Sequence, residues 1–321
     1  MSVETLLPYL KPIAHLITDP GISEIWVNPN GTIFFQRDGV SEEFKAELDC
    51  RHLLQAVKTI ARTSGKDINE SSPLLDCRLP DGSRIAAAIP PATLGVMLTI
   101  RKFRPNWYTL AQLVEAGALP ASLADLLATA VRNRKNILLS GGTGTGKTTF
   151  VKAFVDLIPA HERLAVIEDT RELPISHRNF WSYEARPQVR ASNGDVLMSA
   201  ITIRDYVKAA LRNGPDRVIV GEVRGPEAFD LLDAMNTGHT GSISTLHANS
   251  ADHALSRLAS LAIRADSGVP HHALQYEVGD LIDYSVHFRK VDERRFIDDV
   301  VEVHGFNSAS NRYEVTNVYR A

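Results

Sequence analysis

Cysteine is scarce in this chain: Cys50 and Cys77 are the only two among 321 residues. They have no metal-ligand spacing and are too few to build a disulfide framework. We therefore expect reduced, half-buried side chains of the kind found in a cytosolic protein. The first residues also lack a basic leader followed by an apolar core, so we expect no signal peptide.

Long apolar runs and an excess of one charge are missing as well. The longest apolar stretch, around Ile85 to Ile100, contains Pro90 and Pro91 and could not cross a bilayer as a helix. Any membrane association is therefore expected to be peripheral or through partners. The formal charge is −3 and no lysine- or arginine-rich run occurs, which argues against direct nucleic-acid binding.

What the chain does have is the composition of a soluble globular protein, with 44% apolar and 23% charged residues. Its length suggests two domains. The first hundred residues mix both element types, which predicts an α+β domain. Helices are expected at 6–17 and 53–62, and strands at 22–27, 32–37, 78–89 and 96–103, with turns at 28–31 and 80–82. The first helix could lie on a membrane surface, although packing on its own sheet is the commoner fate.

The polar, aromatic stretch Lys102–Tyr108 is interrupted by proline and is predicted to be a linker. The expected division is an N-terminal domain at 1–101, the linker at 102–108 and a second domain at 109–321. In the second domain, helices alternate with short apolar strands at 136–140, 164–168, 217–221 and 242–246. That alternation is typical of an α/β fold with a mostly parallel sheet flanked by helices. The tail at 284–318 adds β-like segments around turn residues 307–311.

A glycine-rich turn separates the strand predicted at 136–140 from a helix that begins near Thr149. Its residues fit the pattern G-x-x-x-x-G-K-[ST]: Gly141, Gly142, Thr143, Gly144, Thr145, Gly146, Lys147 and Thr148. The amides of such a loop and the positive end of the helix bind phosphates, while Lys147 reaches the terminal ones and Thr148 can hold Mg²⁺. We include Thr149 among the nucleotide-binding residues. The sequence therefore predicts a site for ATP or GTP, with no base-reading motif to separate the two.

Carboxylates follow two further predicted strands, at the strand ends where open α/β sheets bind their ligands. Glu168 and Asp169 could hold Mg²⁺ or its water shell, although a solvated acidic turn is an equal alternative. Glu222, after the next strand, would orient and polarise the water that attacks the γ-phosphate. Gly221 stands where many P-loop enzymes carry a magnesium-binding aspartate.

Two histidines, His239 and His247, flank the strand predicted at 242–246. A single histidine is usually structural, but a pair amid Ser, Thr and Gly is less easily dismissed. Their eight-residue interval does not place both on one helix face, so we predict no metal site there. We expect one of them to sense the γ-phosphate. His239 is assigned to nucleotide binding, and His247 is assigned to catalysis together with Glu222, Lys147 and Glu168.

Four ordered segments, GGTGTGKTT, IEDTREL, DRVIVGEVRGPEA and NTGHTGSISTLHANS, resemble the Walker A, Asp box, Walker B and His box of the secretion ATPases. EIWVNPNG, LPDGSRI and LTIRKF resemble the N-terminal domain of that family, so the resemblance covers nearly the whole chain. It is nearest to the TrbB-like proteins of conjugation and type IV secretion. The chain lacks the tetracysteine zinc element and the long N-terminal extension of larger relatives, which fits the compact type IV form.

The resemblance implies a RecA-like second domain, a ring of six subunits and a nucleotide held between the two domains. It also casts Arg84 and Arg101 as arginines that close onto the phosphates, whereas alone they would be strand-end surface charge. Hydrolysis of ATP with Mg²⁺ would gate that closure and drive a type IV secretion or conjugation apparatus at the inner membrane from the cytoplasmic side. A nucleic-acid translocase, an assembly platform controlled by nucleotide binding and a pilus retraction motor are the alternatives.

Overall fold

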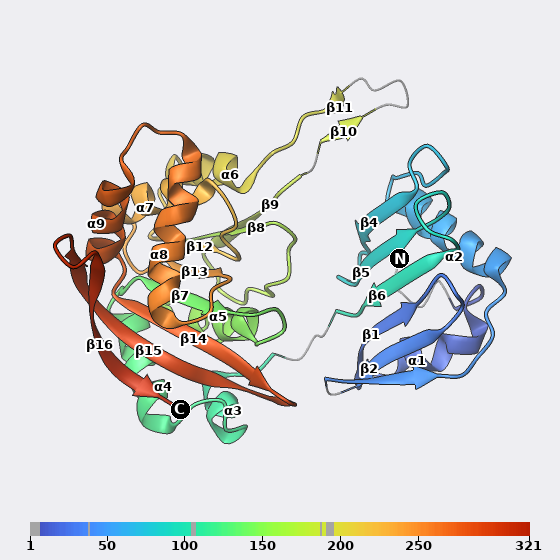
Figure 1. Cartoon of the computed structure of the whole chain (residues 1–321), viewed down its shortest axis with the longest axis horizontal. Helices are drawn as coiled ribbons and strands as arrows, with labels where there is room; N and C mark the ends of the chain where they lie inside the picture. Colours follow the sequence, from blue (N-terminus) through green and yellow to red (C-terminus); the bar gives the residue numbers. More distant parts are fainter. Residues whose placement is uncertain (1–6, 38, 104–106, 187, 191–195) are drawn as a thin grey trace. The chain divides into compact units, whose positions relative to one another are not determined.

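The chain forms two compact units, Met1–Asn106 and Trp107–Ala321 (Figure 1). This computed structural model describes residues 7–37, 39–103, 107–186, 188–190 and 196–321. The predicted linker at 102–108 spans the division between the units, and its residues 104–106 lie outside the described residues. The N-terminal unit has one buried core, and the C-terminal unit has a core on each face of its sheet.

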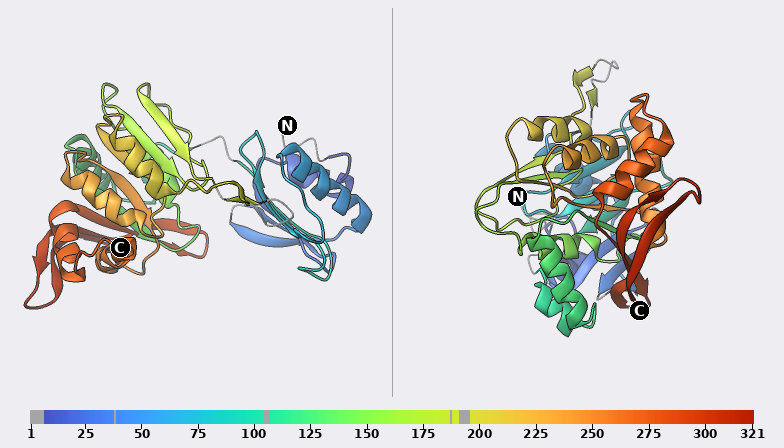
Figure 2. Two further views of the ribbon diagram at one scale, coloured as in Figure 1. Left: turned by 90° about the horizontal axis from the view of Figure 1, so that it is seen from above. Right: turned by 90° about the vertical axis from the view of Figure 1, so that its left-hand side faces the viewer.

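The N-terminal unit is built on a six-stranded sheet in the order β3-β2-β1-β6-β5-β4, in which all neighbours are antiparallel. The strands are β1 (Ile22–Val27), β2 (Ile33–Arg37), β3 (Val40–Phe44), β4 (Leu74–Arg78), β5 (Arg84–Ala88) and β6 (Met97–Arg101). Helix α2 (Cys50–Thr63) lies over one face, where its Val57 and Ile60 join Ile25 and Ile100 in a single core (Figure 2). The predicted hairpin at 22–37 and the predicted α+β character are present.

The opening helix is shorter than predicted. The predicted start, Leu6, lies outside the described residues, and the segment forms a 3₁₀ turn, η2 (Lys11–Ile13), followed by α1 (Ala14–Thr18). Pro12 explains the late start, because proline has no amide hydrogen to donate and is tolerated only in the first turn of a helix. Ile13 and Ile17 are buried in the core of the unit, so the apolar stripe packs on its own domain.

Two further expectations in this unit need correction. The stretch 78–89 is not one strand: the turn at 80–82 separates β5 from β4, which begins at Leu74, and β3 was not predicted. The two free cysteines are also not half-buried. Cys50 is exposed in the first turn of α2, whereas Cys77 faces the core because side chains on β4 alternate between the two faces of the sheet.

The C-terminal unit contains an eight-stranded sheet in the order β16-β15-β14-β7-β13-β12-β8-β9. Its strands are β7 (Ile137–Gly141), β8 (Leu164–Glu168), β9 (Phe180–Glu184), β12 (Arg217–Val220), β13 (Ile243–Leu246), β14 (Tyr284–Val291), β15 (Arg294–Asn307) and β16 (Arg312–Arg320). From β14 to β9 all neighbours are parallel, and β15 and β16 continue the sheet as antiparallel strands. This confirms the predicted α/β fold. β10 (Val189–Arg190) and β11 (Val196–Met198) form a separate two-stranded ribbon.

Helices cover both faces of this sheet (Figure 1). The helices α3 (Leu110–Glu115), α4 (Ala121–Arg132) and α5 (Lys147–Val155) share one core, and α6 (Ile203–Leu211), α7 (Glu227–Asn236), α8 (Ala251–Ala262) and α9 (His271–Leu281) share the other. The strands are apolar on both sides: Ile137 and Leu139 face the first core, and Leu138 faces the second. Burial of each side chain of this size stabilises the folded state by about 1.5–3 kcal/mol. A shift of one residue would move these side chains to the opposite face, so their burial fixes the register of the strands.

Because β7, β8, β12 and β13 are parallel, their carboxyl ends meet at one edge of the sheet. We call this the carboxyl edge; the chain leaves it at Gly142, Asp169, Gly221 and His247. The strands begin at the opposite, amino edge. Most of the residues predicted to act on a nucleotide follow these four strands and therefore lie at the carboxyl edge.

Candidate active site

The glycine-rich loop runs from the buried strand β7 directly into α5, as the sequence predicts. Gly141 has a φ of 152° and Gly146, the N-cap of α5, has a φ of 98°. A β-carbon on Gly141 would stand 2.6 Å from the carbonyl oxygen of Phe288 on the neighbouring β14, so only glycine fits there. Gly146 likewise needs the left-handed conformation that starts the helix. The loop thus presents the first turn of α5, including Thr148 and Thr149, at the carboxyl edge.

Lys147 lies folded against its own loop. Its side-chain Nζ donates hydrogen bonds to the carbonyl oxygens of Gly141 (2.9 Å) and Gly142 (2.8 Å), and the residue is only 8% exposed. Burial lowers the pKa of Lys147, while the nearby Glu222 carboxylate acts to raise it. The ammonium is held by neutral carbonyl groups, and an anionic phosphate is a stronger acceptor for it.

A chain of charged contacts joins the ends of β8, β12 and β13. Glu222 Oε2 accepts a hydrogen bond from Nη2 of Arg224 (2.7 Å), and Nη1 of the same arginine donates to Asp169 Oδ2 (3.1 Å). Nε2 of His247 lies 3.0 Å from the buried Oε1 of Glu222. The structure therefore brings together three residues that the sequence predicted separately, Glu222, Asp169 and His247.

The environment of Glu222 favours its ionised form. Burial on its own would raise the pKa of this carboxyl group. The hydrogen bond from Arg224, followed by the positive charges of Arg224, His247 and Lys147, reverses that effect, so the pKa of Glu222 is lowered below its ordinary value. A carboxylate that stays ionised can accept a proton from a nucleophilic water.

Glu168, the last residue of β8, has a very different environment. It is 3% exposed, and its Oε1 accepts hydrogen bonds from the backbone N–H groups of Glu172 (2.9 Å) and Leu173 (3.0 Å). Its Oε2 is buried and has no hydrogen-bond partner among the described residues. Burial raises the pKa of Glu168 to about 7. Glu168 is thus not part of a solvated acidic turn, whereas the side chain of Asp169 is about half exposed.

Glu168 also explains the glycine at 221. Gly221 continues β12 beside the end of β8, and its amide donates to the carbonyl oxygen of Ile167 (2.8 Å). A β-carbon at Gly221 would stand 3.0 Å from Cγ of Glu168, closer than ordinary van der Waals contact. The space beside the end of β12 is therefore taken by a carboxylate from the adjacent strand.

His239 is not brought to the glycine-rich loop. It precedes β13 and lies at the amino edge, where its Nδ1 is 3.1 Å from the carbonyl oxygen of Ala234 at the end of α7. His247 follows the same strand at the carboxyl edge. An extended strand advances about 3.3 Å per residue, so two histidines on either side of it cannot meet at one edge.

Arg84 and Arg101 lie in the N-terminal unit, opposite each other on the paired strands β5 and β6. Nε of Arg101 donates to Glu24 Oε1 on β1 at 2.7 Å. The two arginines therefore share one end of the N-terminal sheet, and the structure places them in a different unit from the glycine-rich loop.

Several residues of the carboxyl edge were not identified from the sequence. Arg224 was recognised only as part of a motif, although its position two residues after Glu222 was a usable signal. Thr245 donates from Oγ1 to the carbonyl oxygen of Gly221 (2.7 Å) and accepts from the Val223 amide through its own carbonyl oxygen (2.7 Å). Arg295 on β15 donates from Nε to the carbonyl oxygen of Gly144 (2.8 Å). No local pattern could reveal that last contact, because the two residues are 151 positions apart.

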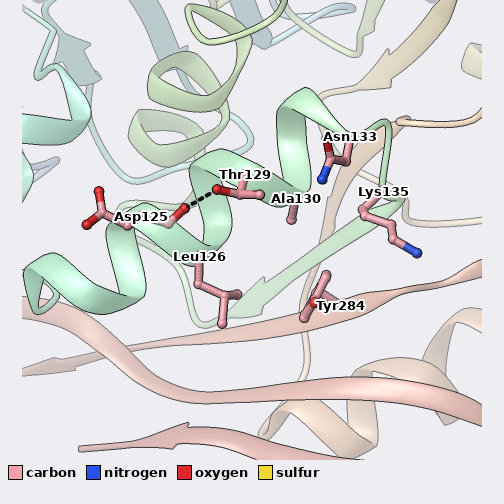
Figure 3. A pocket seen from close by; sticks show the side chains of 7 residues that line it. All are labelled: Asp125, Leu126, Thr129, Ala130, Asn133, Lys135 and Tyr284. Atoms are coloured by element: carbon pink, nitrogen blue, oxygen red, sulfur yellow. Dashed lines mark hydrogen bonds between the residues drawn. The ribbon is translucent and has the colours of Figure 1, made fainter.

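The described residues of the C-terminal unit form hollows at two places of interest. One, of about 410 Å³, lies at the carboxyl edge and is lined by Gly141, Gly142, His247, Ala248, Asn249, His253, Ser256, Arg257 and Ser260. The other, of about 330 Å³, lies beside α4 and the starts of β7 and β14 and is lined by Asp125, Leu126, Thr129, Ala130, Asn133, Lys135 and Tyr284 (Figure 3). It contains none of the predicted site residues.

No group of three or more His, Cys, Asp or Glu side chains in the described parts of the chain is arranged to hold a metal ion. Across the same described residues, the helices are too short or too polar to cross a membrane.

The amino-acid sequence matches a known protein family. Residues 8–286 match the family model described as "Type II/IV secretion system protein". The chain is 31% identical over 305 residues to the "Probable conjugal transfer protein TrbB" of Sinorhizobium fredii, covering 93% of this chain and 88% of that protein. It is 34% identical over 317 residues to the "Type IV secretion system protein PtlH" of Bordetella pertussis, covering 89% and 90%.

A solved structure shares the fold. The ATPase DotB of Legionella pneumophila superposes with a TM-score of 0.65 at 20% sequence identity, covering 94% of this chain and 81% of that one. At that identity the likeness shows the arrangement of the elements and nothing about the chemistry.

Proposed function

Because this chain belongs to the type II/IV secretion system protein family, we propose that it hydrolyses ATP to drive a conjugal-transfer or type IV secretion apparatus. The observation that carries the proposal is the cluster at the carboxyl edge, where Glu222, Asp169 and His247 join one network of charged contacts and Glu222 and Lys147 influence each other's pKa. A phosphate-binding loop beside an ionised, half-buried carboxylate is the arrangement that phosphoryl transfer to water requires.

Nucleotide binding falls to the loop Gly141–Thr148 and the first turn of α5. The loop amides and the positive end of the helix would hold the phosphates, and Lys147 would exchange two carbonyl oxygens for phosphate oxygens. Thr148, Glu168 and Asp169 are the residues proposed to hold Mg²⁺, partly through water. The buried, partnerless Oε2 of Glu168 fits that role, since a hydrated cation would supply its missing donor. When bound, Mg²⁺ neutralises charge on the phosphates.

Glu222 is the proposed general base. Its lowered pKa keeps it ionised, so it can orient the attacking water and accept a proton from it. His247 lies against the other carboxylate oxygen and is placed to fix its orientation. His239, at the opposite edge, is left out of this mechanism.

The motor function extends the proposal to the whole assembly. Six copies would form a ring, and Arg84 and Arg101 of the N-terminal unit would close onto the phosphates and open after hydrolysis. The partners would be components of a type IV secretion or conjugation machine, and the protein would be cytoplasmic, reaching the inner membrane through them. This is supported by the names of the relatives, a conjugal transfer protein and a type IV secretion protein.

A transfer assay in cells separates a motor from a platform that needs only bound nucleotide. Lys147→Ala removes phosphate binding, and Glu222→Gln keeps binding but removes the base. We expect both variants to lose transfer by about 100-fold or more, because a motor needs turnover. Transfer that survives in Glu222→Gln but not in Lys147→Ala would replace the motor with a platform.

A further inference from the structure

Resting on the proposed function, we propose that Arg224 senses the γ-phosphate of ATP and releases Glu222 when it binds. In the arrangement shown, the guanidinium of Arg224 holds Glu222 and Asp169 at the same time. A triphosphate offers the guanidinium a stronger anionic partner. When Arg224 moves to the γ-phosphate, one oxygen of Glu222 becomes free to bind the attacking water.

The contacts of Glu222 show why a release step is needed. Oε2 accepts a 2.7 Å hydrogen bond from Arg224, and Oε1 is buried with Nε2 of His247 at 3.0 Å. A general base must have an oxygen within hydrogen-bond reach of the water that it deprotonates. While Arg224 stays in place, Oε1 is buried and Oε2 is held by the guanidinium, so Arg224 competes with the attacking water for Oε2.

The backbone that carries Arg224 is fixed, so the side chain is the part that can move. Glu227 at the start of α7 is buried, and its Oε1 accepts from the backbone amides of Arg224 (2.6 Å) and Gly225 (2.8 Å). The amide of Val223 donates to the carbonyl oxygen of Thr245 at 2.7 Å. The side chain of Arg224 itself is 58% exposed. A rotamer change of an exposed side chain is fast and needs no change in the fold.

Charge explains why a triphosphate would draw Arg224 away. The positive charge of Arg224 lowers the pKa of Lys147 and the negative charge of Glu222 raises it, so the three groups influence one another beside the loop. A guanidinium binds phosphate oxygens through two parallel N–H groups. We expect this contact to be stronger than the one that Arg224 makes with the half-exposed carboxylate of Asp169. A diphosphate lacks the terminal group and would leave Arg224 on Glu222 and Asp169. The contact pattern therefore predicts discrimination between ATP and ADP.

The test compares binding of ADP and of a non-hydrolysable ATP analogue, each with Mg²⁺, by isothermal titration of the full chain. In Arg224→Gln we expect the affinity for the analogue to fall about tenfold and that for ADP to change less than about twofold. Arg224→Lys keeps the charge but not the paired contact, so it should retain part of the preference. The matched control is Arg178→Gln, since Arg178 is exposed and precedes β9 at the amino edge.

An equal loss for both nucleotides, or no loss for either, would overturn the role of Arg224. The role of Arg224 would also be overturned if Arg178→Gln changed the preference for the ATP analogue over ADP as much as Arg224→Gln does. Hydrolysis by the wild-type protein is measured in parallel. Absence of wild-type turnover would count against the proposed function, while the ratio of the two affinities would still decide for or against Arg224.

Discussion

At the scale of single residues, the two carboxylates Glu168 and Glu222 differ more than their sequence contexts indicate. Both directly follow or end an apolar strand. Burial raises the pKa of Glu168, whereas the hydrogen bond and charge of Arg224 outweigh burial and lower the pKa of Glu222. The sequence predicts that both carboxylates lie at the carboxyl edge. It could not predict this difference, because the neighbours of each come from other strands.

The pKa of Glu168 gives a pH dependence with a definite sign. Its folded pKa of about 7 lies above the ordinary value of 4.5, so the folded state binds the proton more tightly than the unfolded state. The stability that it contributes is complete below pH 4.5 and is lost as the pH rises to about 7. As the pH rises from 5 to 8, the free energy of unfolding of Glu168→Gln should therefore increase by about 1–3 kcal/mol relative to that of the wild type. Denaturant unfolding without divalent cations measures this difference. If the difference in unfolding free energy between Glu168→Gln and the wild type does not change with pH, the raised pKa of Glu168 is contradicted.

Gly221 and Glu168 should be coupled. Gly221→Ala forces a β-carbon to 3.0 Å from Cγ of Glu168, and we expect it to destabilise the protein by about 1–2 kcal/mol and to reduce turnover. Shortening the partner with Glu168→Ala removes that clash. Thermal or denaturant unfolding of both single variants and the double variant should then show that the costs are not additive. Strictly additive costs would mean that the two side chains do not compete for space.

At the scale of elements, the parallel strands β7, β8, β12 and β13 agree with the prediction because they are apolar on both faces. The strand predicted at 164–168 coincides with β8, and the one predicted at 136–140 differs from β7 by one residue at each end. The opening helix was predicted too long because apolar spacing outweighed Pro12. His239 and His247 flank β13, so the strand carries them to opposite edges of the sheet and only His247 lies beside Glu222.

The antiparallel extension of the sheet supports the phosphate-binding loop. Nε of Arg295 on β15 donates to the carbonyl oxygen of Gly144, which helps to orient the loop. We expect Arg295→Ala to weaken nucleotide binding about three- to tenfold with little loss of stability, since the side chain is exposed. The neighbouring Arg294, also exposed, provides the control as Arg294→Ala. Equal binding by the two variants would remove Arg295 from the site.

At the scale of the whole molecule, the two units contribute different charged groups to the proposed motor. The C-terminal unit holds the loop and the carboxylates, and the N-terminal unit carries Arg84 and Arg101 as neighbours on one sheet. The sequence could predict both units from the change in their patterns of apolar residues. It could not predict that Arg84 and Arg101 would pair across β5 and β6, because that depends on the register of a sheet.

The proposed motor is tested most directly by ATP turnover of the purified full chain, with its mass measured by light scattering in the presence of a non-hydrolysable analogue. We expect the wild type to form a hexamer and to hydrolyse ATP. Glu222→Gln should bind the analogue with an affinity within about threefold of wild type and lose about 100-fold or more in kcat. Wild-type turnover in Glu222→Gln would contradict the assignment of the base, and a monomer without turnover would contradict the ring motor.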